Sequence, residues 1–195
     1  MTSVLETLRA AMPGVSLDDA PSADGMPSIQ VDRGDLVEVC RTLRDHPDLQ
    51  FAFFVDATAA DFAPAHPRFQ AVYHVACLGA AFSQPSGAAA PRRLRLKVQV
   101  PDDDPRLPSV TSVYPAAGWP EREIYDLFGI LFDDHPDLRR ILMPDDWEGF
   151  PLRKDYPVQI RKETSGWEPI QVTAEEFAAT FRASRVPSRR PPGGS

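Results

Sequence analysis

The chain is poor in cysteine, the residue that ligates iron–sulfur clusters and many zinc ions, with only two among its 195 residues. Cys40 and Cys77 both lie inside apolar patterns, which favours buried small hydrophobic side chains over a disulfide or a ligand site. Two isolated cysteines cannot supply the four thiolates of an ordinary iron–sulfur cluster, and no C-x-x-C pair is present for zinc. The sequence therefore predicts neither site on this chain.

Long apolar runs, a net positive charge and nucleotide-binding loops are also missing. No stretch approaches the roughly 18 apolar residues of a membrane-spanning helix, and the N-terminus MTSVLETLRAAMPG lacks the features of a signal peptide. We therefore expect any membrane contact to come through a partner. The net charge of −7 argues against general nucleic-acid binding. No Walker A loop, G-x-G-x-x-G motif or G-x-S-x-G motif is found.

Several segments carry clear secondary-structure patterns. Capping boxes, in which a glutamate follows a hydroxyl or carboxylate by three residues, predict helices that begin at Ser3, Asp35 and Thr173. The segments 51–57 and 69–78 are almost continuously apolar, as in strands that are central or covered on both faces. Further strands are predicted at 28–33 and 93–100. In the latter, apolar residues alternate with Arg93, Arg95, Lys97 and Gln99, which predicts a basic outer face.

The order of these segments predicts the fold class. The Gly/Pro/Ala-rich linker 79–92 favours a hairpin. Helices before and after hairpin-like strands indicate an α+β fold with a mostly antiparallel sheet and flanking helices, followed by an extended Pro-rich interface segment. We divide the chain into a globular core, a charged helix with an extended ribbon, a segment with a short helix and a disordered basic tail. Their bounds are 1–117, 118–158, 159–182 and 183–195.

The charged segment 118–158 holds ten acidic and five basic residues. Its helix is well specified, because Pro120 suits a first turn and Gly129 can end the helix. Ile124, Leu127, Phe128 and Leu131 form an apolar stripe that is expected to pack on the sheet. Arg122 and Asp126, at i and i+4, can pair along the outer side. We expect this charged side, with the ribbon that follows, to face another protein.

Two other interpretations compete with an interface. A charge run is usually a solvated face, but large apolar residues such as Trp147 and Phe150 alternate with these charges, and exposed apolar surface usually marks an interface. Alternatively, Asp133, Asp134, His135 and Asp137 could hold a divalent metal in a free-standing hydrolase, with Glu121 and Glu123 as further acid/base groups. No metal motif supports this, and the proline after His135 fits a turn in which histidine bonds to the backbone. The interface interpretation is therefore favoured.

Three stretches resemble the thirty-kilodalton subunit family of respiratory complex I, which comprises the C subunits of NADH-quinone oxidoreductase. They are DATAADFAPAHPRFQAVYHVACL, then RLRLKVQVPDDDPRLPSVTSVYPAAGWPERE, then EREIYDLFGI with HPDLRRIL and PDDWEGFPLRKDYPV. They span roughly residues 50–158. Two positions depart from the family pattern: Asp134 stands where glycine usually precedes His-Pro, and Phe150 stands before Pro151 where many members have histidine.

The resemblance implies a hydrophilic peripheral-arm subunit at the cytoplasmic side of a bacterial cell membrane. It implies no flavin, iron–sulfur cluster, quinone site or catalytic residue on this chain. FMN and iron–sulfur clusters are implied on partner subunits of an enzyme that passes electrons from NADH to quinone, coupled to ion pumping. The implied partners are the D subunit, of the forty-nine-kilodalton type, and the B subunit. A related membrane-bound hydrogenase or an oxidoreductase with another donor is the alternative.

The interface is expected to use charged, aromatic and turn residues of the signature segment, in contacts within the chain or across the boundary. They are Glu121, Arg122, Glu123, Tyr125, Asp126, His135, Pro136, Arg139, Arg140, Trp147, Arg153, Lys154, Asp155 and Tyr156.

Overall fold

The computed structural model describes residues 4–20, 22–79, 92–157 and 173–183. The chain divides into two compact units, Met1–Val158 and Gln159–Ser195. Helix α4 (Ala174–Ala183) belongs to the second unit and every other helix and strand described below to the first. The predicted disordered tail at 183–195 lies outside the described residues except for Ala183.

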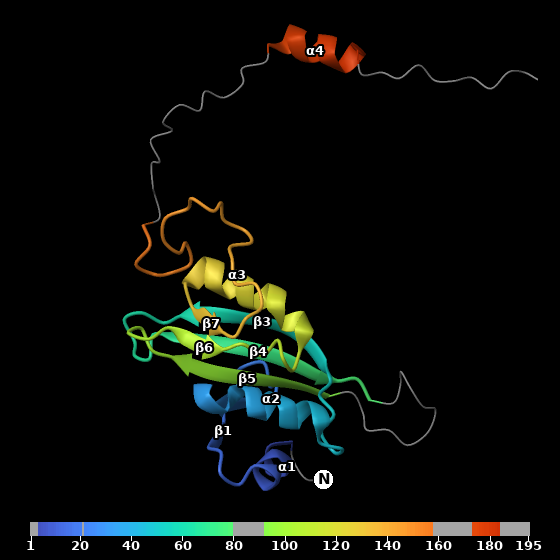
Figure 1. The fold of residues 1–195 in the computed structure, drawn as a ribbon, viewed down its shortest axis with the longest axis vertical. Coiled ribbons are helices and arrows are strands. Elements are labelled where there is room, and N and C mark those ends of the chain that lie inside the picture. Colours follow the sequence, from blue (N-terminus) through green and yellow to red (C-terminus); the bar gives the residue numbers. More distant parts are fainter. Residues whose placement is uncertain (1–3, 21, 80–91, 158–172, 184–195) are drawn as a thin grey trace, which may run out of the picture. The chain divides into compact units, whose positions relative to one another are not determined.

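A five-stranded sheet lies at the centre of the first unit, in the order β1-β2-β5-β4-β3 (Figure 1). Neighbouring strands are antiparallel except for the β2–β5 pair, so the predicted α+β class with a mostly antiparallel sheet is confirmed. A separate parallel pair joins β6 to β7, before and after helix α3. The bounds are β1 Leu17–Asp19, β2 Ser28–Val31, β3 Phe53–Asp61, β4 Phe69–Cys77, β5 Arg92–Val100, β6 Arg106–Pro108 and β7 Leu131–Asp133.

The strand patterns are confirmed in part. In β5, Leu94, Leu96, Val98 and Val100 are buried, while the alternate residues reach the other face, as predicted. β4 and β5 pair antiparallel, which confirms the predicted hairpin. The prediction for 51–57 is wrong in one respect. β3 is an edge strand, and its Phe53 and Val55 side chains are about half exposed instead of being covered on both faces.

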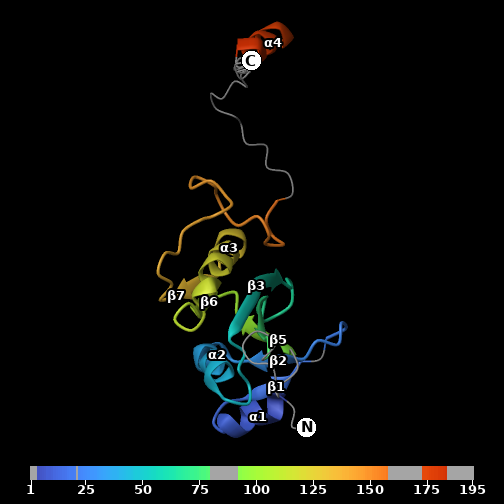
Figure 2. The ribbon, with the colours of Figure 1, turned by 90° about the vertical axis from the view of Figure 1, so that its right-hand side faces the viewer.

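Helices α2 (Leu36–Asp45) and α3 (Gly118–Phe128) lie on the same side of the sheet (Figure 2), while α1 (Val4–Ala11) contacts α2 and β1. Two short 3₁₀ turns, η1 (Arg33–Asp35) and η3 (Pro115–Ala117), lead into α2 and α3. At α4 the capping box is confirmed, because Thr173 and Glu176 bond each other's backbone N–H groups. At α2 the helix begins after Asp35, but the predicted capping box is wrong, because Asp35 makes no capping bond and η1 precedes the helix. Ser3 lies outside the described residues.

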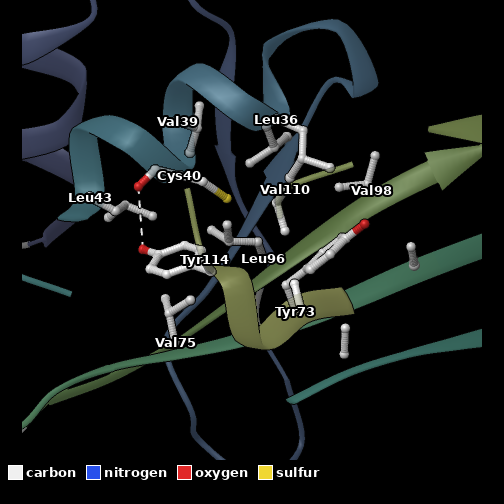
Figure 3. Packing of buried hydrophobic residues seen from close by; sticks show 14 of the residues in the cluster. Leu36, Val39, Cys40, Leu43, Tyr73, Val75, Leu96, Val98, Val110 and Tyr114 are labelled. Atoms are coloured by element: carbon white, nitrogen blue, oxygen red, sulfur yellow. Dashed lines mark hydrogen bonds between the residues drawn. The ribbon is translucent and has the colours of Figure 1, made fainter. Parts of the chain in front are cut away.

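The core sits between this side of the sheet and α2 and α3. Figure 3 shows the Cys40 side chain among apolar neighbours from α2, β4 and β5. Burial raises the pKa of its thiol to about 12, and Cys77 is also buried. Both cysteines are therefore packed as small hydrophobic residues, as predicted. The Tyr114 hydroxyl spans the layers by donating to the backbone oxygens of Phe51, at 2.7 Å, and Cys40, at 3.3 Å.

Tyr73 presents a different hydroxyl at the centre of this core. Its side chain is fully buried, and its oxygen has no hydrogen-bond partner within the described part of the chain. An unmade buried hydrogen bond carries a desolvation cost of about 1–3 kcal/mol. We therefore expect Tyr73→Phe to raise the free energy of unfolding by about 1 kcal/mol, measured by urea denaturation. Tyr114→Phe, which removes a bonded hydroxyl, is the matched control and should lower it; equal effects would contradict the prediction.

Candidate subunit interface

Helix α3 and the extended segment after it form the predicted interface region. We call residues 134–157 the ribbon; it lies on the side of α3 away from the sheet (Figure 1). As predicted, α3 ends at Gly129, whose φ of 72° is the left-handed conformation that glycine favours. The helix also buries Ile124 and Phe128 in the core. Its apolar stripe therefore packs against its own sheet, and the question is what covers the other side.

In the middle of the helix, the ribbon covers this other side through its bonds to Asp126. Its carboxylate is fully buried and accepts hydrogen bonds from the backbone N–H groups of Ile141, Leu142 and Met143, at 2.7 to 3.0 Å, and from the Arg140 guanidinium at 2.7 Å. Burial alone would raise the pKa of Asp126, but these bonds outweigh it and the net shift is downward. The carboxylate thus fixes three successive residues of the ribbon against α3.

Arg122 holds the neighbouring part of the ribbon. Its guanidinium donates to the backbone oxygens of Arg139 and Arg140, at 3.1 and 3.0 Å, and lies 5.1 Å from the centre of the Trp119 ring. The predicted Arg122–Asp126 pair along the outside of the helix is therefore wrong. The side chains of Arg122 and Asp126 each bond ribbon residues instead, so the charged side of α3 faces its own chain.

Glu121 is also turned inward rather than toward a partner. Its fully buried carboxylate accepts hydrogen bonds from the Ser109 hydroxyl at 2.6 Å and the Val110 backbone N–H at 2.8 Å. Burial raises its pKa to about 7. Because the side chains of Glu121, Arg122 and Asp126 all lie inside the fold, a partner cannot contact them without opening it. The predicted contacts of these three residues thus form within the chain, one of the two possibilities that the sequence left open.

The raised pKa of Glu121 predicts how stability depends on pH. The folded state keeps the proton up to pH about 7, whereas the unfolded chain releases it near 4.5. This contribution is therefore present below pH about 4.5 and is lost as pH rises through about 7. Between these pH limits, we expect the free energy of unfolding of Glu121→Gln to fall by roughly 2–3 kcal/mol less than that of the wild type.

Urea denaturation at several pH values between those limits measures the effect. The matched control is Glu123→Gln, which alters an exposed glutamate of the same helix. Parallel pH profiles for wild type and Glu121→Gln would show that burial does not perturb this carboxyl group.

His135 anchors the start of the ribbon through both ring nitrogens. Nδ1 accepts the Asp137 backbone N–H, and Nε2 lies 3.0 Å from the Gly118 backbone oxygen, to which it donates. Both bonds go to the backbone, as the sequence predicted for a turn histidine. Asp133 instead pairs with Arg106. Within the described part of the chain, no group of three or more metal-ligating side chains comes together.

The C-terminal part of the ribbon is held by an ion cluster in which Arg68 and Asp61 are buried and Asp102 and Asp155 are exposed. The Arg68 guanidinium contacts Asp61 at 2.8 Å, Asp155 at 2.7 Å and Asp102 at 3.1 Å. The buried Asp61 carboxylate also accepts the backbone N–H of Lys154 at 2.8 Å, and Arg68 draws its pKa well below the usual range. This cluster joins the β3–β4 turn to the end of the ribbon. No residue spacing had indicated it.

The predicted interface residues separate by exposure. Glu123, Pro136, Arg139, Lys154 and Asp155 are exposed, whereas Tyr125, His135, Arg140, Trp147, Arg153 and Tyr156 are partly buried. The prediction missed three exposed apolar side chains: Trp119 is 65% exposed, Leu142 60% and Leu152 49%. We call these three residues, with the exposed charged residues of the ribbon, the ribbon surface.

Comparison with known proteins places the chain in a family. A model described as the respiratory-chain NADH dehydrogenase 30 Kd subunit matches residues 29–162. The chain belongs to this family. The C subunit of NADH-quinone oxidoreductase from Roseiflexus sp. (strain RS-1) is 40% identical over 97% of this chain and 94% of the relative. The C subunit from Saccharopolyspora erythraea is 48% identical, over 66% of this chain and 48% of its own length.

One solved structure agrees with this family membership, and a second shares the fold. A trypsin-resistant fragment of Nqo5 is 34% identical, with a TM-score of 0.53 over 69% of this chain and 96% of the fragment. A chain of the membrane-bound sulfane sulfur reductase, an archaeal respiratory membrane complex, is 19% identical with a TM-score of 0.59. That likeness covers 96% and 92% of the two chains and shows the fold alone.

The two departures from the family pattern both have a structural explanation. Asp134, in place of glycine, adopts a φ of 62°. Asp tolerates this left-handed conformation better than most residues, so the turn keeps its shape. The Phe150 ring lies 5.4 Å from the Arg140 guanidinium and 4.8 Å from that of Arg153. Phe150 therefore stacks between two arginines where a polar residue is more usual.

Proposed function

We propose that this chain is a non-catalytic, cofactor-free scaffold subunit in the peripheral arm of the proton-translocating NADH:quinone oxidoreductase. In this role it supports the module that delivers electrons from NADH, through FMN and iron–sulfur clusters on other subunits, to quinone. Its partners are the D and B subunits of the same complex. It sits at the cytoplasmic side of the cell membrane and reaches the membrane only through the complex. The match to the respiratory-chain family over residues 29–162 carries this proposal.

The geometry of the ribbon supports an assembly role. The Arg140 guanidinium and the Leu142 backbone N–H bond Asp126 within the chain, and the large apolar side chains of Leu142 and Leu152 are exposed. Exposed apolar surface of this kind marks protein interfaces more often than free surface. No helix among the described residues combines the length and hydropathy needed to cross a bilayer. We propose that the exposed part of the ribbon, including Arg139 and Lys154, contacts the partner.

A native gel tests the proposal. The tagged chain is located in mildly solubilised membranes of its host, and the same gel is stained for NADH dehydrogenase activity. We expect the tag in a very large, NADH-active band. A large band without NADH activity would favour a related complex with another electron donor. A soluble chain that migrates alone near 21.6 kDa would contradict the assembly role.

A further inference from the structure

Three arginines at the ribbon, Arg122, Arg140 and Arg153, are directed inward. Arg140 bonds Asp126 and the backbone oxygens of Trp147 and Gly149, and Arg153 bonds those of Phe128 and Gly129. Arg122 is used in the same way, by backbone oxygens of the ribbon. These guanidinium groups stabilise the ribbon from its inner side, which faces α3, and contribute little positive charge to its outer side.

The outside of the ribbon is consequently acidic. Of its exposed charged residues, six are acidic and two are basic. Two of these eight charged residues bond each other, Arg139 and Asp137 at 3.0 Å, and the acidic Asp155 pairs with Arg68 at 2.7 Å. The acidic residues are Asp134, Asp137, Asp145, Asp146, Glu148 and Asp155, and the basic ones are Arg139 and Lys154. The outer surface thus carries a net negative charge, in keeping with the excess of acidic over basic residues in the sequence of this segment.

Apolar side chains stand among these charges along one short helix. Leu142 is tied to α3 by its N–H bond to Asp126, and Leu152 by its N–H bond to the Leu127 backbone oxygen. Trp119 occupies the first turn of the same helix, and the axial rise from it to Asp126 and Leu127 is about 10 to 12 Å at 1.5 Å per residue. Three large exposed apolar side chains over so short a distance favour a docking surface over a solvated one.

We propose that the ribbon surface docks a basic surface of a partner subunit, whose lysine and arginine side chains surround an apolar contact. This rests on the proposed function. Complementary charge steers association and fixes orientation, so an acidic surface selects a basic partner. A second copy of this chain fits poorly, because its own ribbon surface carries the same negative charge.

Charge reversal on the full-length chain tests the proposal. Asp145→Lys with Glu148→Lys reverses two exposed acidic residues, and Asp18→Lys with Asp19→Lys, on β1, is the matched control. Each tagged variant replaces the native copy in its host, and its retention in the large membrane band is measured. At about 0.15 M salt, we expect retention of the ribbon variant in the large membrane band to fall at least fivefold or so. The control should behave as wild type. Wild-type retention should fall as salt rises to about 0.5 M.

Two further results separate the possible failures. Leu142→Asp should also reduce retention, because it places a charge in the apolar contact. If Leu142→Asp is lost from the band while the charge-reversed variant is retained at every salt concentration, the surface docks without a basic partner and the proposal is overturned. The proposed function would then stand. If wild type itself is absent from any large band, both fail. Thermal unfolding of each purified variant must match wild type for a loss to count as support.

Discussion

Asp126→Ala is expected to lower the free energy of unfolding by roughly 4 kcal/mol and to release the ribbon from α3. The substitution removes the acceptor for three backbone N–H groups and leaves the Arg140 guanidinium, 14% exposed, without its carboxylate. Removing one partner of a buried ion pair typically costs about 3–5 kcal/mol, because the remaining charge stays buried. Urea denaturation measures the loss of stability, and proteolysis within residues 134–157 measures the release of the ribbon.

The matched control for this prediction is Asp145→Ala in the same ribbon. Asp145 is exposed, and a surface substitution of this kind usually changes stability by less than about 0.5 kcal/mol. Similar stability of the two variants would mean that the Asp126 carboxylate does not hold the ribbon. Because the folded-state pKa of Asp126 is lowered, its contribution is present above the unfolded pKa near 3.8 and is lost as pH falls below it. The difference between the variants should therefore shrink in acid.

Arg68→Met is expected to cost roughly 3–4 kcal/mol of stability. Methionine keeps much of the volume but leaves the fully buried Asp61 carboxylate without a cation and Asp155 without its anchor. Equilibrium denaturation measures the loss. The double variant Asp61→Asn with Arg68→Met should recover part of it, because the uncompensated charge is then absent. If the double variant is as unstable as Arg68→Met, then Asp61 is not the source of the cost.

The sequence predicted the features that depend on neighbouring residues. The end of α3 at Gly129 follows from one glycine in left-handed conformation, and the faces of β5 follow from strict alternation between Arg93 and Val100. The α+β class follows from the order of the segments. The exposed edge at Phe53 could not be predicted, because an apolar run is the same in an edge strand and a central one.

The internal structure of the interface region could not be predicted because its contacts are distant in sequence. At spacing i, i+4, Arg122 and Asp126 are natural partners, but the ribbon 14 to 17 residues later offers Asp126 three N–H groups and a guanidinium. The Arg68–Asp155 contact spans 87 residues. Similarly, no pattern separates the exposed Leu142 from its half-buried neighbour Ile141, because only the folded path of the ribbon decides which one faces outward. Recognition of the family, in contrast, needed only the order of residue types.

The side-chain bonds that hold the ribbon determine how the chain meets its partner. Much of the backbone between Arg139 and Gly149 is fixed by Asp126, Arg122 and Arg140 within the isolated chain, although the ribbon has no helix or strand. A docking surface that is ordered before contact loses little conformational entropy on binding. Association can then proceed with small backbone movement. Substitutions of the apolar residues on the outside of the ribbon should therefore act mainly on the dissociation rate of the complex, whereas charge reversals act on its association rate.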